Sequence, residues 1–153
     1  MRTQPTPWGT DPNLFAALPG SDAIVGWFGF TPSFHDADLV ELTLTKGDAI
    51  MRIAAFRMTD QVNEAGYFVL DRHAIVSLHM TKVTGVELNG DAHSILAGLV
   101  IRRLEASVPK DRFGTCPGPE AGDYEIAFET SYGLWGALYA RGLALSLEPA
   151  EVP

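Results

Sequence analysis

The sequence predicts a mainly β domain of the α+β class. We expect an antiparallel β sandwich or strongly bent sheet of about seven or eight strands, with two short N-terminal helices. After Pro32, apolar and polar residues alternate with period 2 in at least four segments. Most links between these segments are of hairpin length, and the strand–helix–strand units of parallel sheets are missing. With 153 residues, the chain has the size of one domain, so we expect a loose arm at 1–10 and a single globular domain at 11–153.

Two short helices are predicted before the strands. Asp11 is a helix N-cap residue, and Pro12 after it suits the first helical position. The Pro-Gly pair at 19–20 ends this helix. Ser21 is the predicted N-cap of the second helix, and Gly29 its terminator.

Alternating residues and turn signals then place the strands in order. The predicted strands are residues 40–45, 49–58, 73–80, 83–88, 93–105, 124–129 and a last long strand, broken near Gly142, that ends at Pro149. The segment 93–105 is ambiguous because its apolar residues form a nearly continuous run, but its β-branched residues favour a strand. Tight turns are predicted at 46–48, 89–90 and 131–133. Loops are predicted at 109–122 and at 59–71, the latter with a short edge strand at 67–70.

Charge and composition limit the partners that the chain can have. The formal net charge is −8 and the sequence pI is near 4.8. Such a surface repels a phosphate backbone and suits a basic partner, although an acidic surface also simply keeps many proteins soluble. We expect no membrane span and no signal peptide, and Cys116 is the only cysteine, so no internal disulfide can form. These features predict a cytoplasmic protein, either a monomer or a homodimer.

One polar cluster could carry chemistry, namely His35, Asp36 and Asp38, which follow Phe34. A metal or acid–base site is the functional interpretation. In an extended chain, however, only the two aspartates share a face, and no glycine-rich cation loop is nearby. The structural interpretation is that Asp36 accepts backbone N–H bonds at a strand entry while His35 donates to a carbonyl. We favour this interpretation because polar residues near turns are common.

Other catalytic patterns are missing from the sequence. It contains no Gly-x-Ser-x-Gly elbow, no His-Glu-x-x-His motif and no phosphate-binding glycine loop. His73 and His79 share a face of one strand but lie roughly 20 Å apart at about 3.3 Å per residue, too far to share a metal. We therefore expect no catalytic residues, no metal and no cofactor.

Aromatic residues and carboxylates are the better candidates for binding. Tyr132, Trp135 and Tyr139 cluster around the last predicted hairpin. Aromatic residues are usually part of a core, but an exposed one can anchor a protein partner. Carboxylates on the strand faces are the candidate partners of a basic protein, although each alone is more simply a solvated residue: Glu41, Glu87, Glu125 and Glu129.

Three short motifs resemble those of a known family. They are FGFTPSFHDA at 28–37, HAIVSL at 73–78 and SYGLWG at 131–136, and the similarity spans roughly residues 24–147. Together they resemble the immunity protein 50 family. The resemblance implies a small cytoplasmic protein of a bacterial toxin–immunity system, which binds and neutralises a cognate toxin and has no catalytic residues. The segment around His35 would then be either a fold determinant or part of the toxin-facing surface.

The expected function is therefore that of a non-catalytic protein-binding module whose partner is a basic toxin domain. The alternative is a small metal-dependent hydrolase or ligand-binding domain that uses His35, Asp36 and Asp38. The candidate binding residues are Phe34, His35, Asp36, Asp38, Glu125, Glu129 and Trp135.

Overall fold

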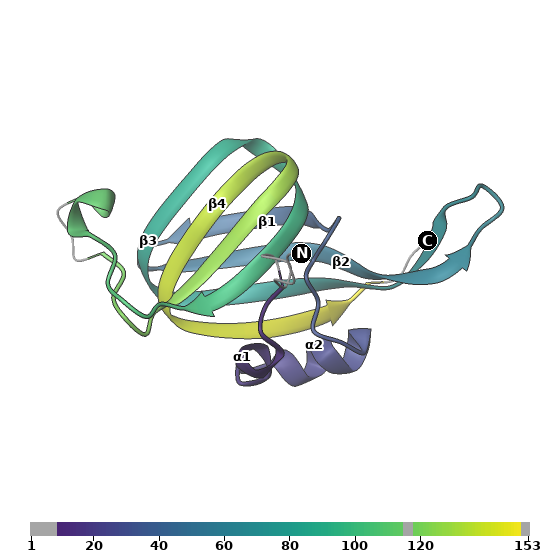
Figure 1. Ribbon diagram of the computed structural model, residues 1–153, viewed down its shortest axis with the longest axis horizontal. Helices are drawn as coiled ribbons and strands as arrows, with labels where there is room; N and C mark the ends of the chain where they lie inside the picture. The colour runs from purple at the N-terminus through teal and green to yellow at the C-terminus, as the bar shows by residue number, and fades with distance from the viewer. Residues whose placement is uncertain (1–8, 115–117, 151–153) are drawn as a thin grey trace, which may run out of the picture.

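The structure, a computed structural model, describes residues 9–114 and 118–150. Four strands form one antiparallel sheet in the order β1-β2-β3-β4, and two short helices precede them (Figure 1). The prediction of a mainly β fold with two short N-terminal helices is confirmed. The elements are α1 (Pro12–Ala16), α2 (Ser21–Phe28), β1 (Asp38–Thr45), β2 (Asp48–Val62), β3 (Phe68–Arg103), the 3-10 helix η1 (Lys110–Phe113) and β4 (Tyr124–Pro149).

The number of strands differs from the prediction, because the single sheet has four long strands in place of seven or eight. β3 has 36 residues and β4 has 26. The turns predicted at 89–90 and 131–133 lie inside these two strands. There, register shifts interrupt the ladder between Asn89, opposite Trp135, and Ser94, opposite Gly133, and pairing continues beyond them. The glycine-containing signals therefore mark bends in paired strands and not strand ends.

The loop predicted at 59–71 is also mostly strand. β2 continues to Val62 and β3 begins at Phe68, so only residues 63–67 form the turn between them. Figure 1 shows this pair of strand ends as an arm that extends away from the rest of the sheet. Both faces of the arm are exposed to solvent. Its residues therefore pair as strands without the alternation of buried and exposed residues from which strands are predicted.

The helix signals were read correctly in most details. The Asp11 carboxylate accepts a bond from the Asn13 N–H at 2.9 Å, and Gly29 ends α2 in the left-handed conformation. Ser21, however, is not the N-cap of α2. Gly20 occupies that position, and the Ser21 hydroxyl donates instead to the Ala16 carbonyl at 3.1 Å.

The sheet curves back on itself. β1 and β2 form the predicted hairpin around the turn at 46–47, with Thr45 opposite Asp48. Farther along the chain, β3 and β4 bend over together (Figure 1), and β3 reaches the start of β1, where Asp38 lies opposite Ile95. The Leu96 N–H donates to the Ala37 carbonyl at 2.8 Å across this junction.

The core lies inside this curve and under the helices. Ile53, Val76 and Leu78 of the sheet are fully buried, and the helices add Phe15 and Ile24. No helix in the described part of the chain is both long and apolar enough to cross a membrane. Residues 1–8 of the predicted arm and Cys116 lie outside the described residues. At Thr10, the last residue of the predicted N-terminal arm, the buried hydroxyl accepts a bond from the Ile101 N–H at 3.0 Å.

Candidate functional site

The predicted site residues fall into two separate places. Phe34, His35, Asp36 and Asp38 lie where the chain enters β1, at the junction with β3. Glu125, Glu129 and Trp135 lie on β4 and line one pocket together with Glu87 of β3. Glu41 lines a different surface hollow and does not belong to either group.

The segment that leads into β1 is built by its backbone. Phe34 and Asp36 both have left-handed backbones, with φ of 63° and 65°. Phe34 is buried, and the Asp36 N–H donates to the Leu96 carbonyl at 2.8 Å. Aspartate tolerates this conformation better than most residues, which explains its presence here. The backbone of this segment and the buried Phe34 therefore hold it against β3.

His35 lies close to Asp36, but it makes no ion pair with Asp38. His35 Nδ1 lies 2.8 Å from the Ala97 carbonyl oxygen, which confirms the predicted bond to a carbonyl. Its Nε2 lies 3.5 Å from a carboxylate oxygen of Asp36. The predicted backbone bonds to this carboxylate are wrong, because no N–H of the described residues donates to it. Within residues 9–114 and 118–150, no three His, Cys, Asp or Glu residues gather in a way that could hold a metal ion.

A small hollow adjoins His35 but leaves the two aspartates out. It measures about 170 Å³, and its walls are mostly apolar, with Phe30, Phe56 and Met58 among them. Among the described residues, His35 and Ser33 are the only polar side chains in its lining, and neither Asp36 nor Asp38 reaches it.

The second group of residues shares a concave surface, which we call the acidic–aromatic pocket. It measures about 510 Å³ and is lined by Glu87, Asn89, Arg112, Glu125, Phe128, Glu129, Trp135, Gly136, Ala137 and Tyr139. Trp135 is 49% exposed, so the tryptophan is not a core residue. The lining of the pocket contains three carboxylates and one guanidinium, so the pocket is net acidic.

Two of the three carboxylates already have partners inside the protein. Arg112 donates to both carboxylate oxygens of Glu87, with Nε at 2.9 Å from Oε2. The Tyr139 hydroxyl donates to Glu125 at 2.9 Å, and Arg102 lies 3.4 Å from the other oxygen of Glu125. Glu129 is exposed, and among the described residues it has no side-chain hydrogen bond or ion pair.

These contacts shift the proton equilibria at the base of the pocket. Burial, together with the hydrogen bond to Glu125, raises the pKa of Tyr139 to about 12. The hydrogen bonds to Glu87 raise the pKa of Arg112. Tyr139 therefore stays protonated and Arg112 stays charged at neutral pH, so both act as fixed donors to the carboxylates. Trp135, Glu129 and Asn89 line the pocket, are exposed, and make no side-chain hydrogen bond among the described residues.

Sequence reasoning found the carboxylates and the tryptophan but not the residues that hold them. Arg112 belongs to η1, in a segment predicted only as a loop, and meets Glu87 across 25 residues. The sequence places Tyr139 in the aromatic cluster around the last predicted hairpin, but its contact with Glu125 depends on the bend in β4. The alternation of strand residues carries no signal for either contact.

Three comparisons with known proteins found no match for this chain. No protein-family model matches the chain, no curated protein matches its sequence, and no solved structure matches its fold.

Proposed function

We propose that this protein is a non-catalytic binding module that neutralises a basic partner protein by stoichiometric binding in the cytoplasm. The observation that carries the proposal is the half-exposed Trp135 together with the unengaged carboxylate of Glu129, in one open pocket. Exposed tryptophans in concave surfaces are frequent hot spots of protein interfaces. The resemblance to the immunity protein 50 family supports the same proposal and indicates a toxin domain as the partner.

Each residue of the acidic–aromatic pocket has a separate part in this proposal. Trp135 inserts into an apolar hollow of the partner, and Glu129 pairs with a lysine or arginine beside it. Glu87 and Glu125 are held by Arg112 and Tyr139, so they shape the wall and add negative potential. The net charge of −8 attracts a basic partner from a distance.

The test is co-expression with the toxin domain encoded beside this protein. The wild type should restore growth and co-purify with the toxin domain as a one-to-one complex. Trp135→Ala and Glu129→Lys should each weaken the Kd by at least about tenfold, since a hot-spot residue contributes about 2 kcal/mol or more.

Two matched controls lie on the arm between β2 and β3, far from the pocket in sequence. Tyr67→Ala removes an aromatic side chain that is 72% exposed, and Glu64→Lys reverses an exposed charge. Both should leave the complex intact. If the pocket variants bind like these controls, the pocket is not the interface. If the purified protein instead turns over a small molecule and His35→Ala abolishes this activity, the binding proposal fails.

A further inference from the structure

One edge of β1 is open. β1 pairs with β2 along its length, but with β3 only where Asp38 lies opposite Ile95. Past this pair, no strand of the described chain covers the second edge of residues 39–45. The backbone groups that point away from β2 are therefore free to pair with an added strand. At about 3.4 Å per residue, the open edge is roughly 20 Å long.

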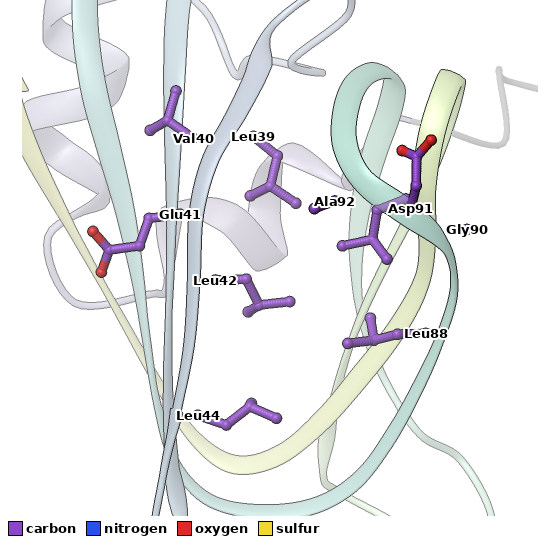
Figure 2. A pocket seen from close by; sticks show the side chains of 10 residues that line it. Leu39, Val40, Glu41, Leu42, Leu44, Leu88, Gly90, Asp91 and Ala92 are labelled. Atoms are coloured by element: carbon purple, nitrogen blue, oxygen red, sulfur yellow. The ribbon is translucent and has the colours of Figure 1, made fainter.

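An apolar groove of about 500 Å³ runs beside this edge, between β1 and the bend shared by β3 and β4. Figure 2 shows Leu39, Leu42 and Leu44 facing Leu88 across the groove. In the β1–β2 ladder these three leucines lie opposite the buried residues Ile53, Met51 and Ala49. Side chains that lie opposite each other across two strands share a face, so the leucines continue the core face of the sheet. Leu44 is nevertheless 51% exposed, which means that the core face is uncovered here.

The charges around the groove favour a basic occupant. Asp91 and Glu41 are the charged residues in the lining of the groove, which includes no Lys, Arg or His, and the Glu41 carboxylate is already paired with Arg52 at 3.5 Å. Figure 2 shows the Asp91 carboxylate at the rim and the Glu41 side chain pointing away from the groove, on the outer side of β1. A second copy of this chain would bring the same rim carboxylate of Asp91 and the same net charge of −8. Like charges would therefore oppose self-pairing at this edge.

We propose that the open edge of β1 binds an extended segment of another protein as an added antiparallel or parallel strand. Alternate apolar side chains of that segment would enter the groove beside Leu42 and Leu44, and lysine or arginine residues would lie at the rim near Asp91. Main-chain hydrogen bonds supply affinity in this mode of recognition, while the groove selects the side chains. The groove shares no lining residue with the acidic–aromatic pocket, so the inference stands apart from the proposed function.

A peptide library tests this inference without knowledge of the natural partner. Random twelve-residue peptides displayed on phage are selected on the immobilised full-length protein. The enriched peptides should alternate apolar residues at every second position and carry a net positive charge. When a synthetic copy of the strongest binder is added, amide hydrogen exchange should slow within residues 39–45.

Matched variants separate the groove from general apolar binding. Leu44→Asp should weaken peptide binding at least tenfold, and Asp91→Lys should weaken it severalfold. Val62→Asp places the same charge at a residue that is 58% exposed but lies on the arm, and it should bind like the wild type. Thermal melting checks that each variant folds. A copy of the peptide with N-methyl groups along one edge keeps its side chains but should lose at least tenfold in affinity.

Several results would overturn the inference. Failure to enrich any peptide, or enriched peptides that bind Leu44→Asp as well as the wild type, would remove the groove as their site. Equal binding of the N-methylated peptide would show that the groove takes side chains without adding a strand. A concentration-dependent dimer that Leu44→Asp abolishes would instead make a second copy the occupant.

Discussion

Tyr139 is the residue whose burial and bonding make the clearest prediction. Its side chain is 2% exposed and donates to Glu125 at 2.9 Å. Tyr139→Phe keeps the ring but leaves the Glu125 carboxylate without this donor. We expect the free energy of unfolding at pH 7 to fall by about 1.5–3 kcal/mol, as is usual for a bond to a charged group. Urea denaturation measures this change.

The pH dependence of the same contact follows from the sign of the pKa shift. The pKa of Tyr139 rises from 10.0 to about 12 in the folded protein, so folding favours the protonated hydroxyl. This contribution is complete below pH 10 and is lost as the pH rises towards 12. The difference between the wild type and Tyr139→Phe should therefore shrink over this interval. A difference that stays constant up to pH 12 would contradict the assigned contact.

At the scale of single residues, the sequence is a better guide to the residues that line the pocket than to the residues that bond with them. Glu125, Glu129 and Trp135 share a pocket because they lie on one strand that bends around it. The role of Asp36 was harder to predict, since its left-handed backbone and not its carboxylate holds the segment against β3. Local sequence shows that aspartate suits a turn but not whether its side chain or its backbone makes the contact.

At the scale of elements, the bends of β3 and β4 depend on glycine. Gly136 has φ of 154°, and a Cβ added there would lie 2.0 Å from the Glu87 carbonyl oxygen on the paired strand. Gly136→Ala should therefore lower the free energy of unfolding by about 2 kcal/mol or more, because the paired backbone must move. Chemical denaturation checks this expectation.

The matched control for this substitution is Gly26, within α2. A Cβ added at Gly26 meets nothing within 4 Å, and the residue is exposed. Gly26→Ala should raise the free energy of unfolding by about 0.5–1 kcal/mol, because alanine loses less backbone entropy in a helix. If both variants lose stability equally, the close approach at Gly136 does not explain the bend.

The positions of most elements could be predicted from the sequence, but their continuity could not. The hairpin of β1 and β2 and the C-terminal end of α2 follow from local signals around residues 46–48 and Gly29. The joining of several predicted strands into β3 depends on β4, which pairs with it across each irregularity. A bulge and a turn use the same glycine-rich residues, so only the partner strand distinguishes them.

At the scale of the whole molecule, closure of the sheet is the feature that sequence patterns predict least. The pairing of Asp38 with Ile95 joins residues far apart in the chain and depends on the accumulated twist and bending of β3 and β4. This closure places the open edge of β1 next to the bend at Leu88 and so creates the apolar groove. No local pattern in residues 39–45 distinguishes such an edge from a fully paired strand.

The net charge of the whole molecule predicts how the rate of association with a basic partner depends on salt. With a net charge of −8, attraction acts over about 10 Å at 0.1 M salt and shortens as salt is added. The association rate with the co-expressed toxin domain should therefore fall at least tenfold between low and high salt, as stopped-flow mixing would show. Glu64→Lys should slow association slightly and leave the dissociation rate unchanged, because Glu64 is exposed on the arm, outside the pocket. Glu129→Lys should slow association and also speed dissociation, because in the proposed complex its carboxylate contacts the partner. Association that is insensitive to salt would show that the acidic surface serves solubility and does not steer a partner.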